Sequence, residues 1–577
     1  MADAPRADLV VAYFSMEIAL DSHIPTYSGG LGVLAADTLR SAADREVSMV
    51  GVSLAHRHGY FFQRIGPGGE QIEEAVHWSP DDWLDPVDAT CAVEIEGRRV
   101  AIRAWRREIV GASGARVPVF LLDTDLEAND PADRHLTDAL YGGDARYRLC
   151  QEVVLGVGGV RLLRALGYAE IRRFHLNEGH SALLALELLR EEAPTGGDLR
   201  DAAAAVSRRC VFTTHTPVPA GQDQFPRELA RRVLGDEAID RLTGLGCCAE
   251  TLNLTLVALH LSHYVNGVTR RHGAISRSMF PGYPIGSITN GVHSVTWTSP
   301  PFQALYDREI PNWRTDPHRL RYVANVALED VRRAHAQAKW RLMLEVNERT
   351  NAGFDKDVLT LGFARRATAY KRPTLLLHDS RRLGEIAARH GGLQIALAGK
   401  AHPDDAEGKR LVQALTRASA DGMPGVRIAF LPNYDVEAAQ LLTAGVDVWL
   451  NTPRPPLEAS GTSGMKAAHN GVPSVSTFDG WWVEGCVEGV TGWGIGPQQS
   501  EAAATRTDAE DAAELYRVLD ERVAPAYADA DAWARIMRST IAVNASFFNT
   551  HRMVDEYVRF AYLGLGNGEH EPTPGSA

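Results

Sequence analysis

The sequence predicts an α/β fold made of two doubly wound, Rossmann-like domains that face each other across a cleft. The chain has 577 residues, more than one ordinary hydrophobic core supports, so two domains are expected. In the second half, short β-rich runs alternate with helix-like stretches, a pattern typical of a parallel sheet covered by helices. In both halves, polar residues directly follow predicted strands, and ligands of open α/β sheets bind at that edge.

The domain boundary is expected where prolines interrupt this alternating pattern. A polar stretch with several prolines spans residues 298–321. We therefore expect an N-terminal α/β domain at residues 1–300, a C-terminal α/β domain at 301–550 and a C-terminal segment at 551–577. From about Gly566 the chain is rich in Gly, Pro and Glu, a composition that predicts a disordered tail.

Strands are expected at short apolar runs rich in β-branched residues. In the second half these runs are Val358–Phe363, Leu393–Leu397, Val426–Leu431, Val446–Leu450 and Pro473–Ser476. In the first half they are Val10–Tyr13, Met49–Leu54, Val117–Leu122, Ile171–His175, Val211–Thr214 and Ser287–Thr289. After the first run of the second half, Pro373 suits a first helical turn and Gly391-Gly392 ends that helix.

Composition and charge exclude several classes of function. Hydrophobic residues make up 45% and charged residues 23%, which is typical of soluble globular proteins. The 60 basic and 73 acidic residues give a formal charge of −13, which argues against a general nucleic-acid surface. The six cysteines are scattered without a CxxC pair, so neither a disulfide framework nor a zinc site is expected.

The chain carries no recognisable export or membrane signal. Its start contains an acidic residue and only a short apolar run, so no secretory signal is expected. No run approaches the roughly 18 apolar residues that a membrane-spanning helix needs. We expect a cytoplasmic protein that does not contact a membrane.

Reactive side chains follow the predicted strands at several places. These places are Asn177 to His180, His215, Asn290-Gly291, Arg365-Arg366, Lys400 and Asn451. Alone, His215 is more often a structural histidine, and Arg366 and Lys371 are usually solvated charges. Together the clusters predict one ligand site at the carboxyl ends of the strands.

The stretch from Glu458 to Lys466 is the most informative part of the chain. It reads Glu-Ala-Ser-Gly-Thr-Ser-Gly-Met-Lys and opens a helix-like segment, so its backbone N–H groups can hold an anion. Lys466 at that place can form a Schiff base with an aldehyde cofactor. A capped helix start with a solvated lysine explains the same residues equally well, and both interpretations stay open on composition alone.

Two other motifs carry less information. The run from Gly30 to Ala35 fits a loose GxGxxA dinucleotide pattern. However, Pro25 and Tyr27 stand between strand and loop, and no P-loop motif occurs in the chain. His175 and His180 lack the HExxH spacing of a zinc protease, so no metal site is expected.

The stretch from Glu458 to Lys466 resembles the cofactor-lysine motif of the glycogen/α-glucan phosphorylase family. The similarity continues through Asn470-Gly471 and Asp479-Gly480 to Glu484. The resemblance, to the short bacterial type of that family, implies a two-domain fold of the GT-B type. It also implies that Lys466 holds pyridoxal 5′-phosphate covalently. The glucosyl unit would be contacted by Glu458, Ala459, Ser460 and Gly461.

Further segments resemble the same family, in the same order along the chain. They are Tyr13 to Glu17, Ser28 to Gly32, Leu176 to His180, Thr214 to Thr216, Thr289 to Gly291, Arg365-Arg366 with Tyr370 to Arg372, and Asn433-Tyr434. The similar region covers about residues 8–500, which makes the resemblance specific.

The resemblance implies a role for each matched residue. Catalysis would depend on Lys466, Arg366, Lys371 and His215. The cofactor would be bound by Lys466, Gly30, Trp297, Tyr434, Thr462 and Arg366. Apart from the residues that follow Glu458, the substrate would contact Gly30, Leu31, Asn177, His215 and Asn290.

The activity that the resemblance implies is phosphorolysis. Inorganic phosphate would cleave terminal α-1,4-linked glucosyl units from an α-glucan or maltodextrin and give α-glucose-1-phosphate with retained configuration. The 5′-phosphate of the cofactor would assist proton transfer, in place of the usual pair of carboxylates. Homodimers are common in the family, and no nucleic-acid partner is expected.

Differences from the long animal and plant forms leave the preferred glucan open. The differing positions are Thr368, His293 and Ser463-Gly464. Few residues precede the first core strand, so regulation there by AMP or phosphorylation is not expected. Two alternatives remain: a nucleotide-sugar glycosyltransferase of the same fold, similar to glycogen synthase, and a catalytically inactive glucan-binding protein.

Overall fold

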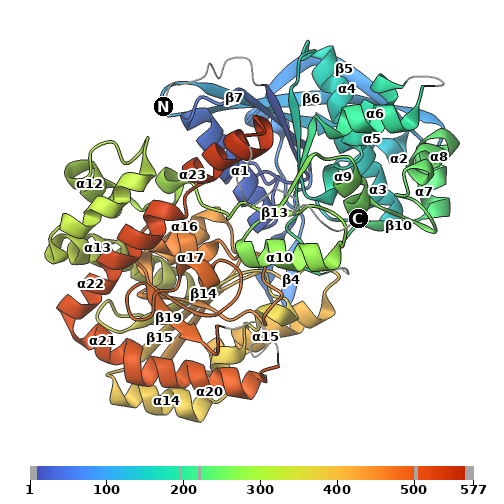
Figure 1. The fold of residues 1–577 in the computed structure, drawn as a ribbon. Helices are drawn as coiled ribbons and strands as arrows, with labels where there is room; N and C mark the ends of the chain where they lie inside the picture. Colours follow the sequence, from blue (N-terminus) through green and yellow to red (C-terminus); the bar gives the residue numbers. More distant parts are fainter. Residues whose placement is uncertain (1–9, 194–196, 219–221, 499–504, 566–577) are drawn as a thin grey trace. The chain divides into compact units, whose positions relative to one another are not determined.

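The computed structural model describes residues 10–193, 197–218, 222–498 and 505–565, and its contacts divide the chain into two compact units (Figure 1). Unit 1 consists of Met1–Phe61, Ala75–Thr289 and Met553–Ala577. Unit 2 consists of Phe62–Glu74 and Asn290–Arg552. This division falls after Thr289, whereas the expected boundary follows residue 300. The predicted disordered tail lies outside the described residues.

Unit 1 is built on a nine-stranded sheet with seven parallel strands and two antiparallel ones at an edge. The strand order is β13 (Gly286–Ser287), β12 (Tyr264–Gly267), β9 (Cys210–Thr213), β8 (Arg173–Asn177), β1 (Val11–Ser15), β2 (Met49–Leu54), β7 (Arg116–Asp123), β6 (Arg98–Val110) and β5 (Asp85–Ile95). Strands β1 and β2 are buried along their whole length, as their continuous apolar runs require in a parallel sheet. Most residues of β5 are exposed or half-buried and only Val93 and Ile95 are buried, because one face of this edge meets solvent.

Helices cover this sheet between successive strands (Figure 1). The helices of at least seven residues are α1 (Gly30–Asp44), α3 (Ala145–Val153), α4 (Gly159–Ala165), α5 (Leu184–Glu192), α6 (Leu199–Ser207), α7 (Arg227–Leu234), α8 (Asp236–Gly244), α9 (Leu254–His260) and α10 (Arg270–Met279). Gly159 lets α4 approach β1 closely, because a Cβ there would lie 2.5 Å from Phe14 Cε1. After α23 (Thr550–Glu556), the π-helical turn Tyr557–Tyr562 returns to unit 1.

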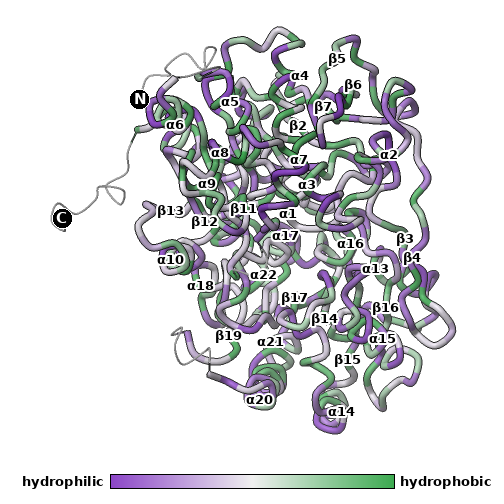
Figure 2. The backbone as a smooth tube through the Cα atoms, turned by 90° about the vertical axis from the view of Figure 1, so that its right-hand side faces the viewer, coloured by the Kyte–Doolittle hydropathy of each residue, from purple (hydrophilic) through white to green (hydrophobic). Residues whose placement is uncertain are grey.

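Unit 2 contains a six-stranded, fully parallel sheet. Its order is β16 (Val426–Leu431), β15 (Leu393–Ala398), β14 (Thr360–Ala364), β17 (Val448–Asn451), β18 (Ser474–Thr477) and β19 (Gly492–Ile495). The order reverses between β14 and β17, which creates the switch point where open sheets bind ligands. Figure 2 shows β15 in green and the outer α14 (Ser380–Arg389) with purple turns, as expected for a covered sheet and an amphipathic helix.

The remaining elements of unit 2 surround this sheet. They are α11 (Ser294–Trp297), α12 (Pro300–Glu309), α13 (Leu328–Thr350), α15 (Ala406–Asp421), α16 (Val436–Gly445), α17 (Ser463–Ala468), α18 (Trp482–Gly485), α20 (Asp508–Val518), α21 (Ala524–Ala528) and α22 (Ala530–Thr540). An antiparallel hairpin of β3 (Phe62–Ile65) and β4 (Gln71–Glu74) also belongs to unit 2, although its flanking residues belong to unit 1.

The predicted strands are confirmed, with small shifts at their ends, and the expectation of mixed α/β architecture with parallel sheets is met. The helix expected from Pro373 was placed wrongly. Residues Leu375–Leu377 form a 3₁₀ turn, and α14 begins only at Ser380, where the Asp379 side chain accepts from the Arg382 N–H. The chain turns before this point because Arg372 has a φ of +47°.

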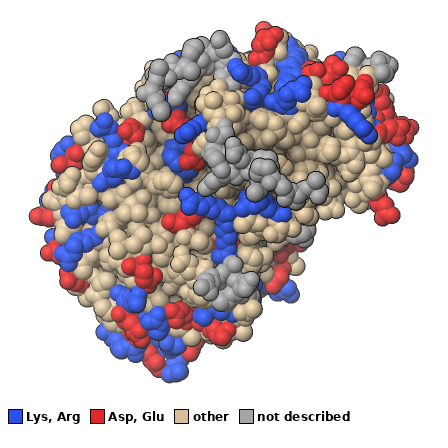
Figure 3. Space-filling model, in the orientation of Figure 1, with Lys and Arg blue, Asp and Glu red and all other residues tan. Residues whose placement is uncertain are grey.

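All six cysteines lie in the described part of the chain and are free thiols. Of the described helices, none is long and apolar enough to cross a membrane. On the face in Figure 3, basic and acidic side chains are interspersed over α13, α21 and α22.

Candidate active site

Four loops that follow strands of unit 2 carry the expected reactive residues. Arg365 follows β14, Lys400 follows β15, Asn433-Tyr434 follows β16, and Asn451 ends β17. Because the strands are parallel, their carboxyl ends lie at one edge of the sheet. The sequence-predicted clusters of this unit are therefore brought to the same edge.

A buried carboxylate, Glu458, lies at the centre of the charged residues there. The Lys371 ammonium donates to both of its oxygens, at 2.8 Å and 2.6 Å. Arg365 Nη2 lies 2.8 Å from Glu458 Oε2, and the Glu458 backbone N–H donates to Asp479 Oδ2 at 2.8 Å. The Glu458 cluster therefore holds two cations against one carboxylate inside the protein.

Burial and charge act in opposite directions on the acid of this cluster. Burial raises the pKa of Glu458, but the charges of Arg365 and Lys371 outweigh it and hold that pKa below its ordinary value. Burial, and then the charge of Arg365, lower the pKa of Lys371 to about 7, although Glu458 opposes this shift. Lys371 can thus change its protonation near neutral pH unless a further anion binds beside it.

Polar atoms with unused hydrogen-bonding capacity occur in the same loops. Among the described residues, Arg365 Nη1, Ser460 Oγ and Asn451 Oδ1 are buried and have no protein hydrogen-bond partner. Such atoms are uncommon in folded proteins, since an unpaired buried polar group costs free energy. Their presence in these loops favours a polar ligand at this edge of the sheet.

Lys466 is buried on the short helix α17, and its Nζ lies 3.8 Å from the centre of the Trp297 ring. Asn470 fixes the segment that carries this ring: its Nδ2 donates to the Trp297 carbonyl at 2.7 Å, and its Oδ1 accepts from the Ser299 N–H at 2.7 Å. Gly464 lets α17 lie against Trp481, because a Cβ there would be 2.6 Å from Trp481 Cζ2. The lysine is therefore held in place, and the interpretation as a solvated lysine is wrong.

The other expected residues of unit 2 have varied surroundings. Ala459, Ser460 and Asn290 are buried, Leu457 to Gly461 forms the loop before α17, and Thr462 precedes its first residue. Gly461 needs glycine because its φ is +81°. Tyr434 is half-buried. Arg366 is exposed, whereas its neighbour Arg365 is the arginine that contacts Glu458.

In unit 1, Asn177 and His215 come together at the ends of adjacent strands. His215 Nε2 and Asn177 Oδ1 are 2.6 Å apart, and Asn177 Nδ2 donates to Ser15 Oγ at 3.0 Å. Because an amide oxygen only accepts, His215 donates from Nε2 and keeps Nδ1 as an acceptor when neutral. Burial lowers the pKa of His215 to about 3, so the imidazole is neutral at physiological pH.

The side chain of Glu178 fixes the segment that carries His215. Its Oε2 accepts from the His215 N–H at 2.7 Å and from the Thr216 hydroxyl at 3.0 Å. Burial raises the pKa of Glu178, and hydrogen bonds from His215 and Gly179 oppose that shift. Its φ of +75° is rare for a residue with a side chain, and such strain is often found at functional sites.

The glycine loop Ser28–Gly32 opens α1. Glu17 Oε2 accepts from the Ser28 and Gly29 N–H groups at 2.5 Å and 3.1 Å, which fixes the loop. Gly30 and Leu31 start a helix of 15 residues whose first turn carries no acidic side chain. The N–H groups at such a helix start have no partner within the helix and attract anions.

Comparisons with known proteins agree with this arrangement. A family model described as "Carbohydrate phosphorylase" matches residues 223–491. The maltodextrin phosphorylase of Thermococcus litoralis is 38% identical over 98% of this chain and 72% of its own length. The glycogen phosphorylase of Mycobacterium tuberculosis is 38% identical over 96% of this chain and 70% of its own. That of Aquifex aeolicus is 33% identical over 96% and 86%.

The chain belongs to the carbohydrate phosphorylase family. The matched segment contains both Lys466 and the Glu458 cluster. The similarity to the relatives extends over nearly the whole chain and thus also includes Gly30 and His215.

In this member of the phosphorylase family, three residues make structurally important contacts that the sequence did not predict. Arg365 pairs with Glu458, Asp479 accepts from the Glu458 backbone, and Asn470 fixes Trp297. Arg365 and Asp479 stand in segments that the sequence singled out, but residue type alone does not show which neighbour points inward. Asn470-Gly471 could have been recognised as a helix end, which is common for this pair.

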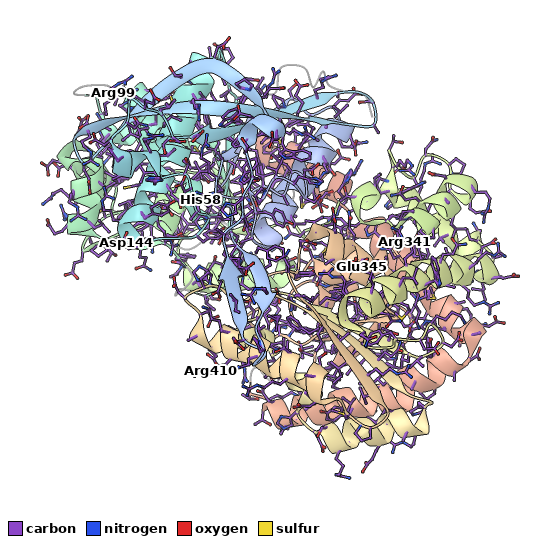
Figure 4. The ribbon with its side chains drawn as sticks, turned by 180° about the vertical axis from the view of Figure 1, so that it is seen from behind. His58, Arg99, Asp144, Arg341, Glu345 and Arg410 are labelled. Carbon is purple, nitrogen blue, oxygen red and sulfur yellow. The ribbon has the colours of Figure 1, made fainter. Side chains whose placement is uncertain are left out.

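A separate cavity of about 540 Å³ lies in unit 2 between the segment Thr296–Pro301, α13 and α16. Figure 4 labels Arg341 and Glu345, which line it from α13. Trp297 is the one predicted site residue that lines this cavity. The cavity is therefore distinct from the Glu458 cluster.

Proposed function

We propose that this chain is an α-glucan phosphorylase. It uses inorganic phosphate to release terminal α-1,4-linked glucosyl units as α-glucose-1-phosphate. The observation that carries the proposal is Lys466, which is buried under Trp297 in the segment that matches the family model. The relatives named maltodextrin and glycogen phosphorylase support the class of substrate.

The residues present fit pyridoxal 5′-phosphate. Lys466 would hold the cofactor covalently through its amine, and the ring of Trp297 provides an aromatic neighbour for that amine. Tyr434, Thr462, Arg366 and Gly30 are the proposed further contacts. When bound, the cofactor supplies a phosphate that can give and take a proton beside the reacting phosphate.

The protein's own contribution is mainly electrostatic. Cleavage of the glycosidic bond creates positive charge on the sugar, and two phosphates close together need compensating cations. Lys371 and Arg366 would bind the reacting phosphate, while Arg365 and Glu458 hold Lys371 in position. A bound phosphate would also raise the pKa of Lys371 and keep its ammonium charged.

The sugar would be held by neutral groups. His215 presents a neutral imidazole whose Nδ1 can accept from a sugar hydroxyl, and Asn177 fixes the ring orientation through Nε2. Further hydrogen bonds would come from Asn290 and from the loop Glu458–Gly461. The proposal requires that unit 1 and unit 2 act on one substrate, and their arrangement across a GT-B cleft remains a prediction from the sequence.

The test is an assay of the purified protein with maltodextrin or glycogen. We expect α-glucose-1-phosphate when inorganic phosphate is added and no glucan extension from a nucleotide sugar. Extension from a nucleotide sugar would instead favour the glycosyltransferase. Binding of glycogen without any sugar phosphate would favour the inactive binding protein.

A further inference from the structure

The hairpin β3–β4 connects the chain of unit 1 to loops of unit 2. The flanking segments Met1–Phe61 and Ala75–Thr289 belong to unit 1, whereas Phe62–Glu74 belongs to unit 2. In Figure 4 the hairpin runs alongside α15, which carries the labelled Arg410. At the hairpin tip, Gln413 Nε2 donates to the Gly68 carbonyl at 3.0 Å, so the tip is fixed to α15.

Two side chains of this hairpin, Gln63 and Gln71, are buried. Gln63 Nε2 donates to the Gly399 carbonyl at 2.8 Å and to Gln71 Oε1 at 2.8 Å. Gln63 Oε1 accepts from the Asn433 N–H at 2.8 Å, and the Gln63 N–H donates to Asn433 Oδ1 at 3.1 Å. Gln63 thus connects the loop after β15 with the loop after β16.

Gln71 holds the same loop after β15 at a second place. Its Oε1 accepts from the Ala401 N–H at 2.9 Å, and its Nε2 donates to the Ala401 carbonyl at 3.0 Å. Lys400 lies between the two residues, Gly399 and Ala401, that the glutamines bind. The peptide groups on both sides of Lys400 are therefore fixed by the hairpin.

The fixed loop in turn supports the backbone of the Arg365 segment. The Ala367 N–H donates to the Lys400 carbonyl at 2.9 Å, and the Arg365 N–H donates to the Ala398 carbonyl at 3.3 Å. A Cβ on Gly399 would lie 2.2 Å from the Arg365 carbonyl oxygen, so the two backbones are in direct contact. A shift of Gly399 would therefore move the segment that leads to Lys371.

We propose that Gln63 and Gln71 are positioning residues for phosphate binding. They fix the loops after β15 and β16, and through Gly399 and Lys400 they fix the Arg365–Lys371 segment. The role of that segment in binding phosphate rests on the proposed function. Asn433 has a φ of +55°, which an asparagine tolerates, and its paired hydrogen bonds to Gln63 stabilise this conformation.

The test compares Gln63→Met and Gln71→Met with a matched control, Arg64→Met. Arg64 lies on the same strand as Gln63, is exposed and pairs with Glu74. Methionine has a similar size to glutamine but leaves the Gly399 carbonyl and the Asn433 N–H without their partners. Where Gln63→Met is not soluble, Gln63→Glu keeps the shape and removes the donor.

The kinetic readout separates positioning from general loss of structure. We expect the KM for inorganic phosphate to rise roughly tenfold in both glutamine variants. The KM for maltodextrin should change less than about twofold, and Arg64→Met should match the wild type in both constants. An unchanged KM for phosphate, or equal changes in both constants, would overturn the proposal.

A second readout does not depend on turnover. Hydrogen exchange is followed by mass spectrometry for peptides that cover residues 365–372 and 433–435, with and without inorganic phosphate. We expect faster exchange in both peptides of the Gln63→Met protein and weaker protection by phosphate than in the wild type. Unchanged exchange would overturn the positioning role, whereas a wild-type protein without phosphorolysis would overturn only the proposed function.

Discussion

At the scale of single residues, the Glu458 cluster concentrates opposing charges on buried side chains. Two cations, Arg365 and Lys371, share the carboxylate of Glu458. The side chains of Arg365 and Glu458 are each 7% exposed, and that of Lys371 is 11% exposed. Removal of the shared partner from such a group is costly because it leaves uncompensated buried charge.

Glu458→Gln should therefore destabilise the protein. We expect the free energy of unfolding to fall by about 3–5 kcal/mol, measured by urea denaturation at pH 7.5. The control is Glu329→Gln, which breaks an exposed pair with Arg333 and should cost about 0–1 kcal/mol. Equal stabilities of the Glu458→Gln protein and the control would contradict the assignment of Glu458 as the shared counter-ion.

Arg366 has a different proposed role, because its side chain is exposed whereas that of Arg365 is buried against Glu458. Arg366→Ala removes one charge-assisted contact, which costs about 2–3 kcal/mol, or roughly 30- to 150-fold in phosphate use. The measurement is the phosphorolysis rate at low phosphate concentration, with Arg308→Ala at an exposed position as the control. A normal rate in Arg366→Ala would exclude this role.

The sequence does not predict which of the two neighbouring arginines, Arg365 or Arg366, is buried. The sequence located this basic pair after a strand, and the family resemblance assigned the phosphate to Arg366. Which of two adjacent arginines points inward depends on the backbone between Ala364 and Ala367, where Gly399 packs closely. That contact joins residues far apart in the chain, so local residue types do not reveal it.

At the scale of helices and strands, the sequence located many of the buried strands but not all, since β12 and β19 are fully buried and were not predicted. Strands such as β1 and β15 are buried throughout and mostly apolar, and they were located from the sequence. The edge strand β5 and its neighbour β6 were missed, because they are long, carry many charged residues and are exposed on one face. The start of α14 was misplaced because Pro373 was assigned to a helix that the turn at Arg372 delays.

The C-terminal turn Tyr557–Tyr562 secures the strands that end in Asn177 and Thr213. His175 Nδ1 lies 2.7 Å from the Tyr562 hydroxyl, and His175 Nε2 lies 2.9 Å from Thr213 Oγ1. Burial lowers the pKa of His175 from its ordinary 6.5 to about 3. The imidazole is therefore neutral in the folded protein over most of the acidic range.

This depressed pKa predicts that acid destabilises unit 1. The contribution of His175 is fully present above pH 6.5 and is lost as the pH falls below that value, since the unfolded chain then binds a proton that the folded chain does not. At pH 5.5 the loss is about 1.4 kcal/mol. His175→Gln removes the titrating group and should lower the difference in unfolding free energy between pH 7.5 and 5.5 by that amount.

Urea denaturation at the two pH values checks the prediction. His260→Gln, which removes an exposed imidazole, is the control. If His175→Gln retains the whole acid sensitivity of the wild type, His175 does not contribute to it.

At the scale of the whole molecule, the chain passes four times between the two units, at residues 61/62, 74/75, 289/290 and 552/553. The expected division placed boundaries after residues 300 and 550 and did not set the hairpin Phe62–Glu74 apart. The hairpin and the C-terminal segment are short, and their assignment depends on contacts with distant residues, such as Gln63 with Gly399 and Tyr562 with His175. The sequence patterns that predict strands and helices do not predict such long-range contacts.

The proposed activity depends on Lys466 more than on any other residue. Its decisive measurement is the absorbance spectrum and the formation of α-glucose-1-phosphate, recorded in parallel for the wild type and Lys466→Ala. We expect the wild type to show the absorbance of lysine-bound pyridoxal phosphate and to form the product, and Lys466→Ala to lose both together. A Lys466→Ala protein that still forms α-glucose-1-phosphate at the wild-type rate would contradict the assignment of Lys466 as the cofactor lysine.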